Sequence, residues 1–257
     1  MTDTLLAVAI GLGAGVLSGA FGIGGGVVMV PALTLVLGFD GLTAVGTSLP
    51  VIFPSAATGA FTYLRAGSAD WRSGVRLGLG GLPTAVAGAW LAERLGGSIV
   101  LAVLVAVVLY TAADMTLQVL RPRAHADAAD AQRESLSWPL GLGIGAITGL
   151  YSGFLGLGGG FIMVPMMTRF GRLAAKRAIG TSLVAILLLA IPGTISHAAL
   201  GNTVWPIAAA LAVGIVPGSL IGSRITLGAS ERAVRIAFAV LLVVVGSLVI
   251  AQEAGWL

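Results

Sequence analysis

The chain is 257 residues long; 57% of its residues are hydrophobic and only 9% are charged. A water-soluble domain carries about 25% charged residues, so the composition excludes a soluble enzyme or binding domain. Cysteine is absent and only two histidines are present, which excludes disulfides and thiolate chemistry and argues against a metal centre. The net charge of +4 does not indicate a nucleic-acid partner, because the basic residues are distributed as in a membrane protein.

Apolar segments follow one another along the chain in two sets of five. The first set covers residues 5–21, 27–37, 43–64, 75–95 and 99–119, and the second covers 140–155, 161–170, 178–200, 204–227 and 233–252. In each set the last three segments reach the roughly 20 residues that a helix needs to cross a bilayer, and the first two are shorter. We predict an all-α integral membrane protein with a first transmembrane repeat at 1–120, a cytoplasmic linker at 121–137 and a second repeat at 138–257.

The two sets are copies of one another at an offset of 134 residues (Gly24 to Gly158). The offset aligns Phe-Gly-Ile-Gly-Gly-Gly at 21–26 with Leu-Gly-Leu-Gly-Gly-Gly at 155–160, and Gly-Thr-Ser-Leu at 46–49 with the same four residues at 180–183. Internal duplication of this size is a common construction of secondary transporters.

Basic residues indicate how the segments cross the membrane, because Lys and Arg are retained on the cytoplasmic side. Of the 14 Lys and Arg residues, all but Arg94 lie in four stretches, at 65–76, 121–133, 169–177 and 224–235. This pattern fits if the first two segments of each set enter and leave on one face and the other three each cross once. The two repeats then have inverted topology, and both termini are predicted to be extracytoplasmic.

Glycines fall into two classes. Those spaced four apart, such as Gly11, Gly15 and Gly19, predict smooth faces where helices pack closely. The clusters at 24–26 and 158–160 disfavour a continuous helix, since each glycine costs about 1 kcal/mol relative to alanine. They predict a break within or near the membrane, and such a break leaves the first amides of the following helix free to bind an anion. The alternative is a tight turn that only lets two helices pack.

We predict a substrate site near the bilayer midplane between the two copies. The breaks would supply backbone amides and the Gly-Thr-Ser motifs would supply hydroxyls to an oxyanion. The alternative for the hydroxyls is that they bond carbonyls of their own helices, as membrane hydroxyls often do. The predicted binding residues are Gly24, Gly25, Gly26, Thr47, Ser48, Gly158, Gly159, Gly160, Thr181 and Ser182.

Asp114 and His197 are the candidate proton carriers near the predicted spans. The alternative for each is an interfacial or helix-paired polar group, and a proton carried by the substrate itself also stays open. His197 does not indicate a serine hydrolase, because the first copy has Tyr63 at its position and no Gly-x-Ser-x-Gly motif occurs. No catalytic residue, metal or cofactor is predicted.

The first copy reads Ser-Gly-Ala-Phe-Gly-Ile-Gly-Gly-Gly-Val-Val-Met-Val-Pro at 18–31 and Ala-Val-Gly-Thr-Ser at 44–48. This resembles the signature of the sulfite exporter TauE/SafE family, and 152–165 with 178–182 resembles it again. The resemblance covers essentially the whole chain. It implies a multi-pass transporter in the cell (inner) membrane of a prokaryote, carrying sulfur-containing anions such as sulfite, sulfoacetate or other sulfonates.

We therefore expect a secondary transporter of small sulfur-containing oxyanions that works by alternating access in the lipid bilayer, and not an enzyme. The alternative is an anion channel, or a transporter of a different small organic anion. A channel should leave a continuous polar track through both copies, whereas the polar residues gather at the Gly-Thr-Ser motifs and glycine breaks. The substrate, the direction of transport, coupling to protons or sodium, and a homodimeric state stay open.

Overall fold

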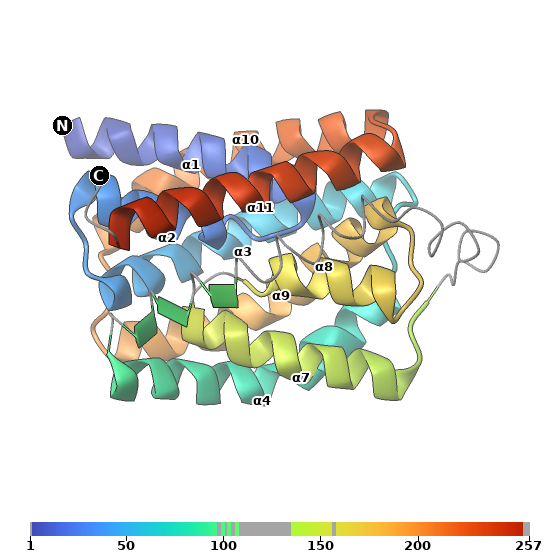
Figure 1. Cartoon of the computed structure of the whole chain (residues 1–257), viewed down its shortest axis with the longest axis horizontal. Helices are drawn as coiled ribbons and strands as arrows, with labels where there is room; N and C mark the ends of the chain where they lie inside the picture. The colour runs from blue at the N-terminus through green and yellow to red at the C-terminus, as the bar shows by residue number, and fades with distance from the viewer. Residues whose placement is uncertain are drawn as a thin grey trace.

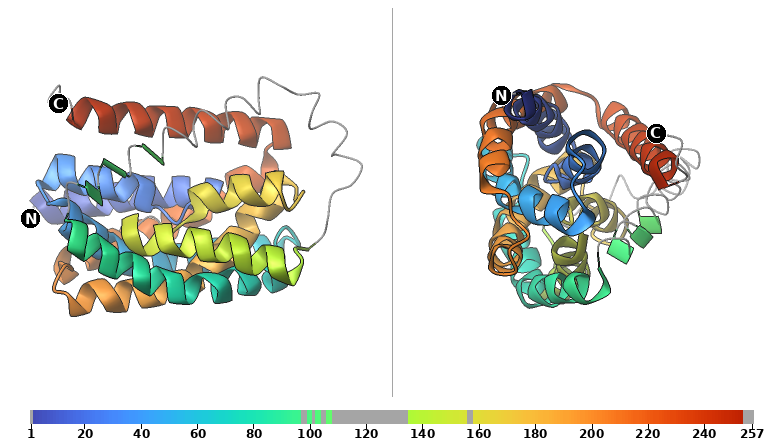
Figure 2. Two further views of the ribbon diagram at one scale, coloured as in Figure 1. Left: turned by 60° about the horizontal axis from the view of Figure 1, so that its bottom comes forward. Right: turned by 90° about the vertical axis from the view of Figure 1, so that its left-hand side faces the viewer.

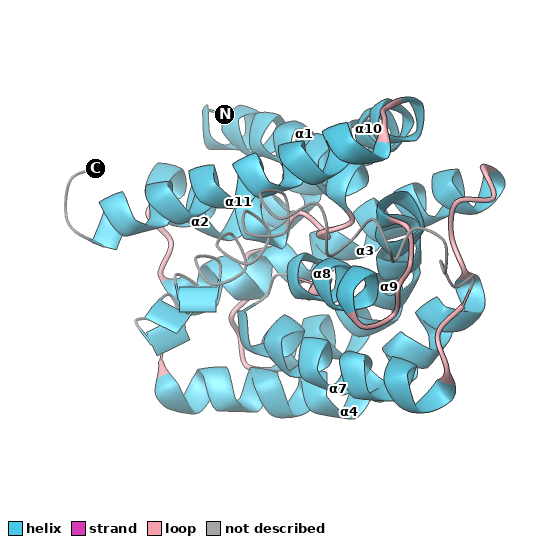
Figure 3. Ribbon diagram, turned by 45° about the vertical axis from the view of Figure 1, so that its right-hand side comes forward, coloured by secondary structure: helices cyan, strands magenta, loops and turns pink. Residues whose placement is uncertain are grey.

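The computed structural model describes residues 2–96, 99–100, 102–103, 106–107, 135–155 and 158–253. The regular structure within these residues is entirely helical (Figure 1, Figure 3), which confirms the all-α prediction. The helices with continuous described bounds are α1 (Thr2–Phe21), α2 (Gly26–Leu37), α3 (Gly41–Arg65), α4 (Trp71–Leu95), α7 (Trp138–Leu155), α8 (Gly160–Arg169), α9 (Ala175–Ala199), α10 (Trp205–Gly228) and α11 (Glu231–Glu253).

These helices repeat at the offset found in the sequence. Both ends of α3 and α9 differ by 134 residues, from Gly41 to Ala175 and from Arg65 to Ala199. The pairs α1 and α7, α2 and α8, and α4 and α10 correspond in the same way, within two residues at each end. The predicted segment at 99–119 falls mostly outside the described residues, and the linker does so up to residue 134.

Four of the described helices are long and apolar enough to cross a membrane: Asp3–Phe21, Gly41–Arg65, Ala175–Ala199 and Trp205–Gly228. In a bilayer a helix satisfies its backbone hydrogen bonds internally, so apolar sequences of this length fold as spans. The α4 helix matches α10 in length but carries Arg72, Arg76, Glu93 and Arg94, and it is not among the four.

The packing of the helices is reciprocal between the two copies. α1 packs along α10, and their counterparts α7 and α4 pack along each other in the same way. α3 and α9 are themselves counterparts and contact one another, while α2 packs on α3 and α8 on α9. α11 lies along one side of this bundle (Figure 2), and its Phe238 stacks on Phe21 with ring centroids 5.4 Å apart.

Glycines spaced four apart make the two closest interfaces, as predicted. A side chain on Gly15 would collide with the backbone of Ile215 on α10, and one on Gly145 would collide with the backbone of Leu77 on α4. Gly13 and Gly143 point away from these interfaces and have nothing within 4 Å of an added Cβ. Small residues therefore let the helix backbones touch, which is a main source of helix association in lipid.

Equivalent helices run in opposite directions. Gly59, near the end of α3, lies against Leu183, near the start of α9, and Gly193 lies against Leu49, near the start of α3. α3 and α9 are therefore antiparallel. In Figure 1, α1 accordingly begins at the left of the bundle and α7 begins at the right.

The starts of α3 and α9 are capped by different means. Asp40 accepts hydrogen bonds from the amides of Leu42 and Thr43, at 3.0 and 3.1 Å. The equivalent residue of the second copy is Ala174, which has no such side chain. Glu231 of α11 replaces it by accepting from the amides of Ala175 and Lys176, at 2.9 and 3.3 Å.

Candidate functional site

Each copy breaks at its glycine cluster because the backbone there enters the left-handed region. φ is +76° at Gly24 and +86° at Gly25, and in the second copy it is +74° at Gly158 and +73° at Gly159. Residues with a Cβ rarely adopt this conformation, so glycine is the residue that fits all four positions. The predicted interruption between the first two segments of each copy is thus present in both.

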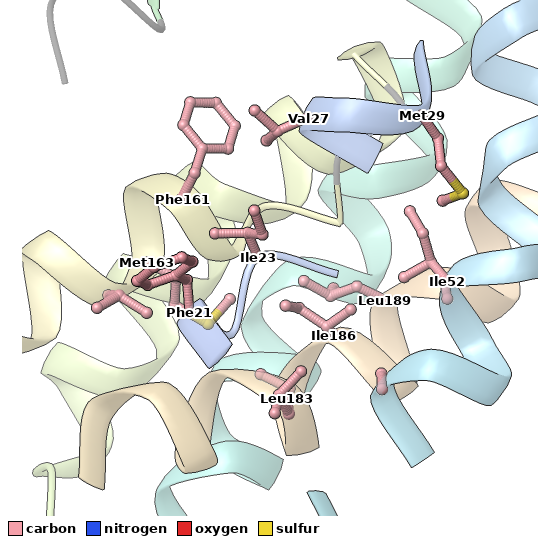
Figure 4. Packing of buried hydrophobic residues seen from close by; sticks show 14 of the residues in the cluster. Phe21, Ile23, Val27, Met29, Ile52, Phe161, Met163, Leu183, Ile186 and Leu189 are labelled. Carbon is pink, nitrogen blue, oxygen red and sulfur yellow. The ribbon is translucent and has the colours of Figure 1, made fainter. Parts of the chain in front are cut away.

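The two breaks meet at the centre of the molecule. A Cβ added to Gly158 would lie 3.6 Å from the Cα of Gly24, its counterpart in the other copy. The same Cβ would lie 3.3 Å from Cγ2 of Ile52 and 3.2 Å from Cγ2 of Ile186. These isoleucines occupy the middle of α3 and α9 and are fully buried, so the breaks face each other halfway along the antiparallel pair (Figure 4).

The helices that follow the breaks have uncapped N-termini. Gly25 and Gly159 are the N-cap residues of α2 and α8, and neither helix has a side chain that bonds its first amides. The first intrahelical bonds reach the Gly25 carbonyl from the amides of Val28 and Met29, at 3.1 and 2.9 Å, and the Gly159 carbonyl from those of Ile162 and Met163, at 3.3 and 3.0 Å. The earlier amides of each first turn precede these bonds, and the helix dipole adds partial positive charge at the same place.

The side chains around this centre are apolar. Ile23, Val27, Ile52, Ile186 and Leu189 are all buried there (Figure 4). In such low-dielectric surroundings, an amide donor attracts an anion more strongly than it would in water. What the centre offers a ligand is therefore a set of neutral backbone donors.

The threonines of the Gly-Thr-Ser motifs lie elsewhere and bridge the two copies. Thr47 Oγ1 accepts a hydrogen bond from the amide of Val204 at 3.0 Å, and Thr181 Oγ1 accepts one from the amide of Asp70 at 2.9 Å. Val204 and Asp70 are the N-cap residues of α10 and α4. Each threonine thus caps a helix of the opposite copy, a role that the sequence did not suggest.

The serines of these motifs bond carbonyls of their own helices, which is the alternative given above for the hydroxyls of these motifs. Ser48 Oγ donates to the carbonyl of Val45 at 2.9 Å, and Ser182 Oγ to that of Ile179 at 2.8 Å. Ser182 also lies 2.9 Å from the carbonyl of Gly22, so it touches the break of the first copy.

The ten predicted binding residues therefore form more than one group. Gly24 and Gly158 come together at the centre. Thr47 and Thr181 are each five residues from the central isoleucines, toward opposite ends of the antiparallel pair. At 1.5 Å per residue, the two threonines are about 15 Å apart along the helix axes. One small anion at the centre cannot touch both.

His197 is fully buried, and its Nε2 lies 3.1 Å from the carbonyl of Gly153. The first copy has the same contact, where Tyr63 donates from its hydroxyl to the carbonyl of Gly19 at 3.0 Å. His197 is thus a helix-paired group in this structure. Asp114, the other predicted proton carrier, lies outside the described residues.

A buried hydroxyl cluster joins α1, α3 and α10 and was not predicted. Ser55 Oγ donates to Ser18 Oγ at 2.7 Å, and Ser219 Oγ donates to the Ser55 carbonyl at 2.9 Å. The counterparts of Ser55 and Ser219 in the other copy are Leu189 and Ala85. A signal was available, because serines in apolar segments without polar partners at the 134-residue offset mark a departure from symmetry.

Comparison with known proteins identifies the family of the chain. The family described as "Sulfite exporter TauE/SafE" matches residues 7–249. The chain is 28% identical to "Probable membrane transporter protein YunE" of Bacillus subtilis, over 94% of this chain and 95% of that protein. It is 31% identical to a "Probable membrane transporter protein" of Xylella fastidiosa, over 97% of both chains. No solved structure matches the chain significantly. The match across nearly the whole sequence confirms the resemblance: the chain belongs to the sulfite exporter TauE/SafE family of membrane transporters.

Proposed function

We propose that this protein is a secondary transporter of small sulfur-containing oxyanions, such as sulfite, sulfoacetate or other organosulfonates. The family description names sulfite export, and the relatives are named as membrane transporters. The observation that carries the proposal is the meeting of Gly24 and Gly158 at the centre, beside the uncapped starts of α2 and α8. Buried amides without capping side chains are suited to an anion.

The proposed topology is an inverted repeat in the membrane. The antiparallel course of α3 and α9 supports it, as do the basic residues at the ends of these helices. Arg65 ends α3, while Lys176 and Arg177 lie in the first turn of α9, so antiparallel packing brings them to the same side. The positive-inside rule makes this the cytoplasmic side. The start of α1 and the end of α11 then lie on the extracytoplasmic side.

The same geometry supports alternating access as the mechanism. The Thr47–Val204 contact closes the interface between the copies at one end, and the Thr181–Asp70 contact closes it at the other. Rocking one copy against the other would open one end at a time around a fixed centre. In this proposed cycle, a state with both contacts made would be the closed intermediate.

The predicted residues would act in sequence in this cycle. An anion entering from either end would pass a Thr-Ser pair and then reach the glycine amides. Accepting a bond from Val204 or Asp70 leaves the O–H of each threonine able to donate to the anion. A donor set without a fixed Arg or Lys suits release, because a buried cation would hold a doubly charged anion tightly.

Anion binding by purified protein, measured by isothermal titration calorimetry, tests the proposal. The ligands are sulfite, sulfoacetate, sulfate and acetate, and the test variant is Gly25→Ala. Gly67→Ala is the matched control, because Gly67 also has a positive φ of +66° but has nothing within 4 Å of an added Cβ. We expect sulfite or sulfoacetate to bind the parent and Gly67→Ala but not Gly25→Ala. Binding of acetate alone would favour a transporter of other organic anions, and equal binding by both variants would move the site away from the breaks.

A further inference from the structure

His197 has a hydrogen-bonding group next to each of its two ring nitrogens. The Gly153 carbonyl can only accept, so Nε2 of His197 carries the hydrogen of their 3.1 Å bond. On the other side of the ring, Nδ1 faces Nδ2 of Asn202 at 3.5 Å. Asn202 Nδ2 also donates to Glu93 Oε2 at 3.0 Å. An amide nitrogen is a donor, so this arrangement fits a neutral imidazole whose Nδ1 is the acceptor.

Asn202 is at the same time part of the contact between the copies. Its backbone carbonyl and Cβ lie directly against Gly46 of α3. The next residue, Thr203, donates from its hydroxyl to the Gly46 carbonyl at 3.0 Å, and Val204 bonds Thr47. The Gly46 carbonyl can accept this bond because Pro50, four residues further along α3, has no N–H to donate to it.

We propose that His197 is a proton-binding site, connected to the surface through Asn202 and Glu93, and that its protonation opens the Thr47–Val204 end of the interface. A proton on Nδ1 would place two donors face to face, since Asn202 presents its NH₂ group there. Asn202 must then turn its amide and give up its bond to Glu93. Asn202 directly precedes Thr203 and Val204, so the loss of its bond to Glu93 loosens this segment and weakens the bonds of Thr203 and Val204 to Gly46 and Thr47. The inference rests on the proposed function, for which it supplies a coupling residue.

Among the described residues of the surrounding helices, Glu93 is the charged group that interacts electrostatically with His197. α7 contributes the Gly153 carbonyl, and Arg94, next to Glu93 on α4, stacks 3.8 Å over the Trp90 ring. The remaining basic residues of α3, α4, α9 and α10 lie at the opposite ends of these helices: Arg65, Arg72, Arg76, Lys176, Arg177 and Arg224. The exposed Glu93 carboxylate would favour the imidazolium and relay a proton from solution.

The other end of the interface has the same construction with a different group. Tyr63 replaces His197, Ser68 replaces Asn202, and Asp70 bonds Thr181 as Val204 bonds Thr47. A phenol ordinarily titrates near pH 10 and an imidazole near pH 6.5. Within the physiological range, protonation at this position would therefore act on one end and not on the other.

Engineered cysteines in a chain that has none test this directly. Leu49 and Leu183 are equivalent, fully buried residues at the two ends of the α3–α9 interface. Leu49→Cys and Leu183→Cys are made singly and labelled with a charged maleimide in nanodiscs between pH 7.5 and 5.5. Rates are divided by that of Leu200→Cys, an exposed position, to remove the pH dependence of the thiol.

Over this range the protonated fraction of an ordinary imidazole rises about tenfold, so we expect up to a tenfold rise for Leu49→Cys and none for Leu183→Cys. His197→Tyr, which copies Tyr63, should abolish the rise. Glu93→Gln alters an exposed residue and should move the midpoint to lower pH, so it keeps the test valid if His197→Tyr does not fold. No rise in Leu49→Cys with His197 and Glu93 unchanged, a rise that survives when His197→Tyr is added, or an unmoved midpoint when Glu93→Gln is added would overturn the proposal. The assay contains no transported anion, so its failure is distinct from failure of the proposed function.

Discussion

Thr181 Oγ1 accepts a hydrogen bond from the backbone amide of Asp70 at 2.9 Å, across a separation of 111 residues in the chain. Thr47 and Val204 form the same bond at the other end of the interface. An unpaired buried amide costs about 1–3 kcal/mol. These two bonds therefore hold the two copies together at equivalent places, and the contribution of each can be tested by mutation.

Replacing Thr47 or Thr181 by valine should lower the free energy of unfolding by about 1–3 kcal/mol, because a buried amide loses its acceptor. Replacement by serine, which keeps the hydroxyl, should cost much less. Thermal unfolding in detergent compares the four variants. If valine and serine destabilise equally, altered packing would explain the effect, and the hydrogen bond would not.

The glycine faces predict a contrast between neighbours on one helix. Gly15→Ala should destabilise the protein by about 1–3 kcal/mol, because the new methyl group collides with Ile215 and overpacks the α1–α10 interface. Gly13→Ala should stabilise it by up to about 1 kcal/mol, since the site is open and alanine favours the helix. Gly145→Ala and Gly143→Ala repeat the comparison on α7. Chemical unfolding of the four proteins gives the result, and equal effects within a pair would contradict the packing described.

The cap at Asp40 predicts a pH dependence of stability. Partial burial alone would raise its pKa, but bonds from the Thr43 hydroxyl and from the Thr43 and Leu42 amides hold the pKa below the ordinary 3.8. A lowered pKa stabilises the fold above pH 3.8, and this contribution is lost as the pH falls through the lower folded value. Asp40→Ala should cost about 1 kcal/mol at pH 7 and progressively less at lower pH. A difference from the parent that stays constant down to pH 3 would show that the charge of Asp40 is not involved.

The proposed topology predicts which sites react with an impermeant thiol reagent in intact cells. Leu200→Cys, in the α9–α10 loop, should be labelled from outside, and Ala126→Cys in the linker should be labelled only after permeabilisation. Leu200 is preferred to the adjacent Gly201, whose φ of +79° would strain a cysteine. The reverse labelling would contradict the inverted repeat, because both copies depend on the same assignment of sides.

Most of the helices could be predicted because lipid requires long apolar runs and glycine clusters interrupt them. The 134-residue offset even predicts equal bounds for α3 and α9. The positions of Thr47 and Thr181 could not be predicted, since a shared motif says nothing about how the copies cross. Antiparallel packing places these two threonines at opposite ends, while it brings Gly24 and Gly158 together at the centre. The capping of α9 by Glu231 could not be predicted from the sequence either, because Glu231 is 56 residues away from Ala175.

Counterflow of labelled sulfite in proteoliposomes tests the central claim most directly. Vesicles containing the parent protein, Gly25→Ala or Gly67→Ala are preloaded with unlabelled sulfite, sulfoacetate or sulfate, with and without a pH gradient. The account predicts transient accumulation of label by the parent and by Gly67→Ala, driven by sulfite or sulfoacetate inside, and none by Gly25→Ala. Rapid equilibration of label without accumulation, whatever anion is inside, would indicate a channel and contradict the account.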